Sequence, residues 1–221
     1  MTQTDGTCAD RFAGVREAFG ANFDRGLEVG ASVSLVVDGD EVVDLWGGHT
    51  DVARTVPWRQ DTIINVWSTT KTMMFLVCLV LMDRGELDPY SPVSRYWPEF
   101  AANDKQDVEV RHLMSHTSGL SGWTEPMVEA DLWDHETCAA RLAAQAPWWA
   151  PGTASGYHAI TQGYLIGEVV KRITGQSLGR FLRREIAEPL GADFHIGTGP
   201  EYDDRVEIGR ASCRERVCVP V

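Results

Sequence analysis

Ser68 and Lys71 lie three residues apart in the segment Ser68-Thr69-Thr70-Lys71. On a helix this spacing places a hydroxyl and an amine side by side on one face. An amine can take the serine proton only when it is uncharged, and lysine is normally protonated because its pKa is about 10.4. The residues that follow Lys71 are almost all apolar, which predicts a helix buried on every side and a lowered lysine pKa. The pair therefore predicts a serine nucleophile that a lysine activates.

The chain around Ser68 strengthens this interpretation. A short apolar run at residues 63–67 predicts a strand that leads directly into the predicted helix at residues 69–84. At such a junction the helix dipole and the backbone N–H groups, including that of Ser68, would stabilise an oxyanion. Chance alone gives roughly one S-x-x-K in a chain of this length. On the motif alone, an alternative therefore stays open, in which Ser68 caps the helix and Lys71 is a surface lysine.

The elements that must position this pair follow from the hydrophobic pattern. Four apolar residues at spacings of three and four predict an amphipathic helix over residues 8–25. Residues 31–37 and 41–46 predict two strands, and Asp38-Gly39 between them suits a type I′ turn.

Helical patterns dominate the rest of the chain. They cover residues 110–115, 136–145, 160–174 and 178–188. Two strands followed by many helices indicate an α+β fold.

Composition excludes several classes of protein. The 221 residues carry a formal charge of −12, and nucleic-acid binding needs clustered Lys and Arg. The first residues show no secretory leader, and the longest apolar run, residues 73–82, is shorter than the roughly 20 residues of a membrane span. Scattered Cys8, Cys78 and Cys138 suit reduced thiols. We therefore expect a cytoplasmic protein without a membrane span, a nucleic-acid partner, a metal or another cofactor; the oligomeric state stays unknown.

The amino-acid composition of the last residues differs from that of the rest of the chain. Residues 208–211 can be encoded by ATC-GGA-AGA-GCN, which begins a widely used sequencing-library adapter, and the next residues continue its translation. We therefore predict a domain portion at residues 1–206 and a non-native, adapter-derived tail at residues 207–221. A genuine basic tail is the alternative.

Two further motifs point to other chemistry. Gly175-Gln176-Ser177-Leu178-Gly179 matches the nucleophile elbow G-x-S-x-G, but it lies between two predicted helices, so Ser177 is expected to cap the second helix. His112 and His116 are four residues apart, but no glutamate follows the first. Packing and hydrogen bonding around a turn are expected for them, not metal binding.

Three segments resemble a known family. They are Trp67 to Lys71, His112 to Leu120, and Pro151-Gly152 with Tyr157-His158-Ala159. Together they are similar to the class C β-lactamase-related serine hydrolases, and most of all to the family VIII carboxylesterases, over nearly all of residues 8–206. The resemblance implies a β-lactamase and penicillin-binding-protein-like fold, in which helices flank an antiparallel sheet and a second part is all helical. It also implies that this chain is incomplete at its C-terminus.

The resemblance also implies roles. Ser68 would form an acyl-enzyme from a small carboxylic ester, with Lys71 and Tyr157 as acid and base. Where the β-lactamases and peptidases carry Asn, this chain has Ala159, which favours simple esters. Candidate pocket residues are Trp123, Trp148, Trp149 and His158. Alternatives are a β-lactamase, a D-amino-acid peptidase-like enzyme, or a penicillin-binding or scaffold protein with little turnover.

The family's third motif is not found in these residues. In intact members it lies on a strand near the C-terminus and supplies the second oxyanion donor. Loss of one such donor costs about 10²–10³ in rate. We therefore expect the present form to be impaired.

Overall fold

A computed structural model describes residues 4–206, so the predicted tail at residues 207–221 lies outside the described residues. The described chain divides into two compact units. The first unit comprises residues 4–65 and 199–206, and the second comprises residues 66–198. Each unit has an apolar core of its own.

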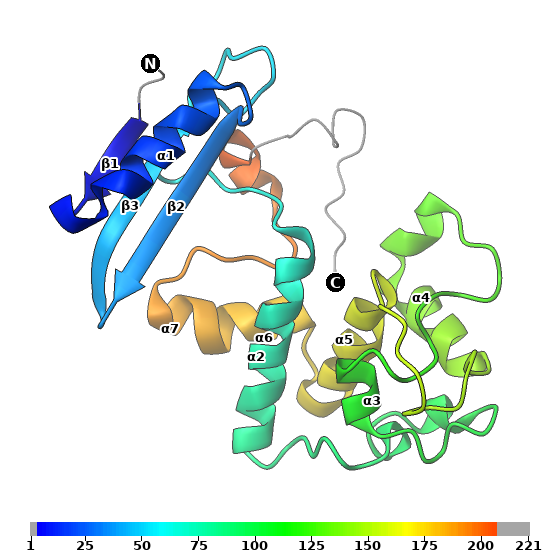
Figure 1. Ribbon diagram of the computed structural model, residues 1–221. Helices are drawn as coiled ribbons and strands as arrows, with labels where there is room; N and C mark the ends of the chain where they lie inside the picture. Colours follow the sequence, from blue (N-terminus) through cyan, green and yellow to red (C-terminus); the bar gives the residue numbers. More distant parts are fainter. Residues whose placement is uncertain (1–3, 207–221) are drawn as a thin grey trace. The chain divides into compact units, whose positions relative to one another are not determined.

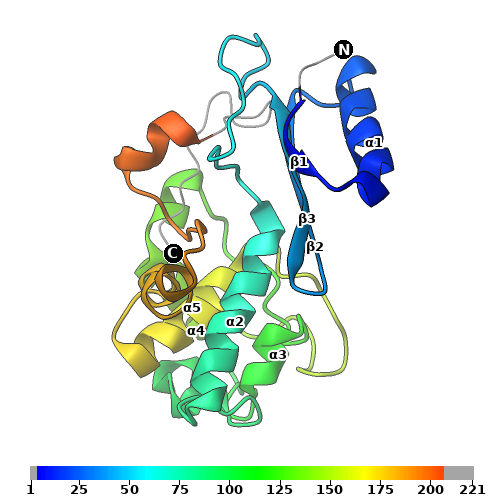
Figure 2. The same ribbon diagram turned by 90° about the vertical axis from the view of Figure 1, so that its left-hand side faces the viewer.

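The first unit is a three-stranded antiparallel sheet with one helix on it. Strands β1 (Thr4–Cys8), β2 (Gly30–Val37) and β3 (Asp40–Gly48) pair in the order β1-β3-β2. Helix α1 (Ala13–Asp24) lies along one face of this sheet (Figures 1 and 2).

The core of the first unit explains why α1 is amphipathic. Phe19 and Phe23 of α1 form one buried cluster with Val43 and Leu45 of β3. Partly buried residues complete that cluster: Cys8, Phe12, Val15, Ala31, Val33, Leu35 and Val42. Apolar side chains that recur about every four residues on the helix thus pack against apolar side chains that recur every two residues on the strand.

The predicted hairpin is confirmed. Asp38 and Gly39 join β2 to β3 with φ of 54° and 88°. Positive φ at both central residues is what a type I′ turn requires, and it matches the twist of the two strands. A bulge between Leu35 and Val36 shifts the register near this turn.

The prediction of a helix from residue 8 was wrong at its start. Cys8 ends strand β1, a 3₁₀ turn covers Asp10–Phe12, and α1 begins at Ala13. β1 was missed because its sequence, Thr-Asp-Gly-Thr-Cys, lacks the apolar alternation of a strand. β1 is held by backbone pairing with β3. Gly6 of β1 has a φ of 101° and lies so close to the Asp44 carbonyl that a side chain at this position would not fit.

The second unit is helical. Its helices are α2 (Thr70–Asp83), α3 (Val110–Met114), α4 (His135–Ala144), α5 (Thr161–Thr174), α6 (Leu178–Leu182) and α7 (Glu188–Leu190). α2, α3, α4 and α6 all pack against α5 (Figure 1). The sheet of one unit and the helices of the other confirm the predicted α+β class.

Short 3₁₀ turns connect these elements. They lie at Asp10–Phe12, Trp67–Thr69, Val93–Arg95, Pro98–Ala101, Glu129–Trp133 and Pro200–Arg205. Within residues 4–206, none of the helices has both the length and the apolar character that crossing a membrane requires.

The prediction that helix α2 is buried on every side was wrong. Met74, Val77, Cys78 and Leu81 are buried, but Leu79 on another face is 55% exposed. The residues before α2 also differ from the prediction, because residues 63–67 form no strand in the described chain. Ile63 makes an isolated bridge to Val206, which belongs to the same unit.

A wide helical turn separates α6 from α7. Residues Arg183–Ala187 form a π-helical turn, and Pro189 follows in α7. Proline has no N–H to donate and its ring meets the carbonyl four residues earlier, so a wider turn accommodates it. Gly191 then ends the helix in the left-handed conformation, with φ of 62°.

Candidate active site

Three side chains from two distant segments meet in the second unit. The Tyr157 hydroxyl donates a hydrogen bond to Ser68 Oγ over 2.6 Å, and Lys71 Nζ donates to the same oxygen over 3.3 Å. Lys71 Nζ also lies 5.0 Å from the centre of the Tyr157 ring. A hydroxyl, an ammonium and a phenol in mutual contact are the parts required for nucleophilic acyl transfer.

Ser68 lies where a tight turn enters a helix. The 3₁₀ turn Trp67–Thr69 runs into α2, whose first turn carries Lys71. Trp67 has φ of 48°, a left-handed conformation that is rare for a bulky side chain. This strained residue directly precedes the candidate nucleophile, and such strain concentrates at functional sites.

Tyr157 lies on a segment without regular structure, between Gly156 and α5. Its side chain is exposed, so a hydrophobic core does not fix it. Its hydrogen bond with Ser68 lowers the pKa of the phenol, and the nearby ammonium of Lys71 lowers it further. The arrangement therefore favours a tyrosine that gives up its proton more readily than usual.

Lys71 is anchored by a backbone carbonyl. Its Nζ donates to the Ala159 oxygen over 2.9 Å, in addition to its contact with Ser68 Oγ. The side chain is half-buried, and α2 itself is exposed on one side. Lys71 thus lies on a helix that is less enclosed than the apolar sequence after it predicted.

His158 lies behind the site. It is fully buried, and its ring nitrogens lie 2.7 Å from Ser118 Oγ and 2.7 Å from the Gly156 carbonyl. With both nitrogens engaged, it presents no polar atom to a substrate. Burial lowers its pKa to about 4, so it is neutral at pH 7.

The candidate pocket tryptophans have different surroundings. Trp123 donates its Nε1 hydrogen to the Cys138 carbonyl and packs on Tyr164, in the helical core. Trp148 is exposed and bonds Thr124. Trp149 packs against Gly156, the neighbour of Tyr157, so it is the one of the three that the structure places next to the site residues.

The predicted turn role of His112 and His116 is confirmed. His112 Nδ1 accepts from the Glu109 N–H at the start of α3, and His116 Nδ1 accepts from the His158 N–H. Neither nitrogen is available for a metal. Residues 4–206 contain no group of three or more His, Cys, Asp or Glu side chains arranged to hold a metal ion.

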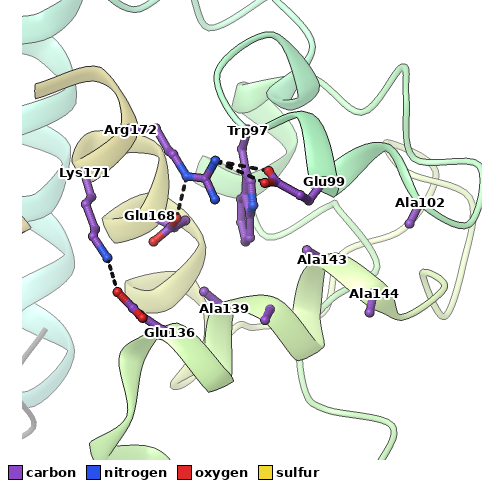
Figure 3. Close-up of a pocket in the computed structure, with 11 residues that line it drawn as sticks. Trp97, Glu99, Ala102, Glu136, Ala139, Ala143, Ala144, Glu168, Lys171 and Arg172 are labelled. Carbon is purple, nitrogen blue, oxygen red and sulfur yellow. Dashed lines mark hydrogen bonds and ion pairs between the residues drawn. The ribbon is translucent and has the colours of Figure 1, made fainter. Parts of the chain in front are cut away.

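A separate groove of about 500 Å³ lies between α4 and α5 (Figure 3). Alanines of α4 form one wall, and Trp97 and Arg172 lie opposite. Lys171 pairs with Glu136, and Arg172 pairs with Glu99 and with the buried Glu168. Ser68, Lys71 and Tyr157 do not line this groove, and its paired charges serve to hold α4, α5 and the 97–102 segment together.

Ser177 has the predicted capping role. Its Oγ accepts a hydrogen bond from the Arg180 N–H at the start of α6, over 3.3 Å. Asp193 and His195 bond each other over 2.7 Å. The G-x-S-x-G segment follows α5 and not a strand, so the context of a nucleophile elbow is absent.

The family model described as Beta-lactamase matches residues 19–219. "Esterase/beta-lactamase LipL" of Mycobacterium tuberculosis is 40% identical over 196 residues, which cover 88% of this chain and 45% of LipL.

Two solved structures are also similar. A family VIII carboxylesterase superposes with a TM-score of 0.90 and 48% identity, covering 93% of this chain and 57% of that one. A penicillin-binding protein homologue from Caulobacter crescentus gives a TM-score of 0.90 and 44% identity, covering 93% and 56% of the two chains. The chain spans about half the length of the curated relatives that it matches.

The capping role of Ser177 gives a first prediction. Ser177→Ala removes the acceptor at the start of α6 and should lower the free energy of unfolding by about 1 kcal/mol. Chemical denaturation followed by circular dichroism measures this change. Ester hydrolysis should stay at the level of the unmodified chain, and its loss at unchanged helicity would instead identify Ser177 as the nucleophile.

Proposed function

Since this chain belongs to the Beta-lactamase family, we propose that it is the nucleophile-bearing part of a serine hydrolase that cleaves small carboxylic esters through an acyl-enzyme on Ser68. One observation carries the proposal: Ser68 Oγ lies within hydrogen-bond distance of both Tyr157 Oη and Lys71 Nζ. The likeness of the chain to a family VIII carboxylesterase and to an esterase/beta-lactamase favours esters as the substrate class.

The contacts support Tyr157 as the proton carrier. In the first step Ser68 Oγ attacks the ester carbonyl carbon, and the Ser68 proton passes to the phenolate oxygen of Tyr157. Tyr157 Oη is closer to Ser68 Oγ than Lys71 Nζ is, 2.6 Å against 3.3 Å. The ammonium of Lys71 then stabilises the phenolate without carrying the transferred proton.

The remaining steps return the protein to its starting state. Collapse of the tetrahedral intermediate breaks the bond to the alkoxide oxygen, which takes the proton from Tyr157 and leaves as an alcohol. Water then gives a proton to Tyr157 and attacks the acyl carbon. The carboxylic acid departs as Ser68 Oγ recovers its hydrogen.

Stabilisation of the oxyanion involves the start of α2. Ser68 lies in the 3₁₀ turn that runs into this helix, so its own N–H and the helix dipole favour negative charge on the substrate oxygen. We propose that full turnover belongs to a protein of its relatives' length, and that the 221-residue chain reacts more slowly.

The alternative substrates are β-lactams and peptides. The name of LipL includes both esterase and β-lactamase, and one similar structure is described as a penicillin-binding protein homologue. In this chain position 159 is alanine, whose carbonyl binds Lys71 and whose side chain offers no amide to a substrate. This observation favours esters over amides.

The nucleophile can be tested on the 221-residue chain itself. An activated alkyl phosphonate should add one phosphonyl group to the wild type, and Ser68→Ala should take up none. Mass spectrometry of the intact chain and of its peptides measures the adduct and its position. An adduct on another serine, or equal labelling of Ser68→Ala, would contradict the proposal.

The same variant tests turnover. In a protein of the relatives' full length, Ser68→Ala should reduce hydrolysis of p-nitrophenyl butyrate by at least about 10³-fold. The 221-residue chain, measured alongside, should turn over more slowly than that protein.

The proton carrier gives a prediction about pH. The base is the phenolate, so the rate of Ser68 labelling should rise with pH through the Tyr157 pKa, which is lowered from its ordinary value of 10.0. Tyr157→Phe should reduce the rate by about 10²–10⁴ and remove this rise.

Lys71 variants separate the two possible bases. Lys71→Met removes the cation beside Tyr157, so the rise should move to higher pH. Lys71→Arg keeps a cation that cannot act as a base, and it should retain more activity than Lys71→Met. Equal loss in both variants, with the rise abolished in both, would make Lys71 the base.

Position 159 gives a prediction about specificity. Ala159→Asn supplies a side-chain amide and should raise the rate of nitrocefin acylation, relative to ester cleavage, by about 2–10-fold, the worth of one hydrogen bond. Ala159→Leu is the matched control, with similar size and no amide. A ratio that stays the same in both variants would show that this position does not select the substrate.

A further inference from the structure

Two histidines, His116 and His158, form hydrogen bonds with the backbone next to Tyr157. Gly156 N–H donates to the His116 carbonyl over 3.0 Å, and His158 N–H donates to His116 Nδ1 over 3.1 Å. The two residues that flank Tyr157 thus both donate their backbone N–H to one residue. The His116 ring also lies 4.7 Å from the Tyr157 ring, centre to centre.

His116 is held in the shape that these bonds need. Its φ is 62°, in the left-handed region that few residues other than glycine adopt. In this conformation its carbonyl and its ring nitrogen both face the 156–158 segment. Thr117 continues the contact, because its carbonyl accepts from the Gly152 N–H.

His158 links the 156–158 segment to the turn that contains Ser118. Its Nδ1 faces the Gly156 carbonyl, which can only accept, so Nδ1 carries the proton. Its Nε2 then accepts from the Ser118 hydroxyl over 2.7 Å. His158 is fully buried, so these two bonds fix its ring without competition from water.

Both histidines must be neutral for this arrangement. Protonation of His116 Nδ1 would remove the acceptor of the His158 N–H, and protonation of His158 Nε2 would force the Ser118 hydroxyl to accept instead of donate. The charged group that faces them is Lys71 of α2, and it disfavours a charge on either ring. Burial acts in the same direction and is the larger cause for both.

Ala159 links the same segment to Lys71. The residue after His158 offers its carbonyl to Lys71, two residues after Tyr157 reaches Ser68. A shift of this segment would therefore disturb the phenol and the ammonium together. Since the segment has no helix or strand of its own, its place depends on contacts such as those of the two histidines.

We propose that His116 and His158 are positioning residues: a neutral histidine pair that fixes the 156–159 segment, so that Tyr157 and the Ala159 carbonyl hold Ser68 and Lys71 in reacting geometry. This inference rests on the proposed role of Ser68. The two histidines do not touch the reacting atoms, and they act through Tyr157 and the Ala159 carbonyl.

The test compares two variants of His116. His116→Asn keeps an acceptor near the place of Nδ1, and His116→Gly removes it. Asparagine and glycine both tolerate the left-handed backbone, so strain does not separate them. The measurement is the second-order rate of phosphonyl labelling of Ser68 in the 221-residue chain from pH 5 to 9, with His195→Asn as control.

A positioning role predicts a specific pattern. His116→Gly should label about 10²-fold more slowly, His116→Asn within about 5-fold of the wild type, and His195→Asn at the wild-type rate. In His116→Gly the rise with pH that belongs to Tyr157 should move to higher pH, because the phenol is no longer held against Ser68 and Lys71. A merely structural role would leave that rise in place.

Other outcomes overturn the inference in distinguishable ways. If Ser68 of the wild type is labelled and His116→Gly matches it in rate and pH profile, the positioning role is wrong and the proposed function stands. If Ser68 of the wild type takes no label, the proposed function fails and the positioning role fails with it.

A second variant covers the case in which His116→Gly does not fold, as judged by circular dichroism. Ser118→Ala removes only the hydroxyl that donates to His158 Nε2. It should slow labelling by about 3–10-fold with the melting transition retained. A wild-type rate in Ser118→Ala and in His158→Gln would then overturn the proposal.

Discussion

The burial of helix α5 is the constraint on which the rest of the helical unit depends. Thr161 and most of the residues through Val170 are buried, and α2, α3, α4 and α6 pack on them. Its first turn also bonds to α3 and to the loop after it, because Thr161 Oγ1 donates to the Leu120 carbonyl and Gln162 Nε2 to the Leu113 carbonyl. The helix thus fixes the end of the 156–159 segment and the turn that holds it, which explains how an exposed tyrosine can be held in place.

Much of the fold could be predicted from local pattern. The hairpin was evident because alternating apolar residues flank Asp38-Gly39, and α5 because its apolar face repeats at helical spacing. β1 could not be predicted in the same way, because its stability comes from pairing with β3 and not from its own residues. The exposed face of α2 was also hidden, since an apolar sequence shows what can be buried and not which packing partners the chain supplies.

The candidate site was predictable only in part. Ser68 and Lys71 are neighbours by helical spacing, so the sequence alone brought them together. Tyr157 is 89 residues from Ser68, and only the family resemblance suggested that they meet. His116 and His158 show the limit most clearly: the sequence placed His116 at a turn and His158 in a pocket, but the hydrogen bonds around Tyr157 depend on two loops that no local pattern joins.

The same separation of 89 residues has a consequence for how the protein is made. At a synthesis rate of about 5–20 residues per second, Ser68 leaves the ribosome roughly 4–18 s before Tyr157 does. Throughout that interval neither the phenol nor the Ala159 carbonyl is present to activate the serine or to hold Lys71. The nascent chain therefore carries an inert hydroxyl, and chemical reactivity becomes a late product of folding, acquired only when the helical unit has almost been completed.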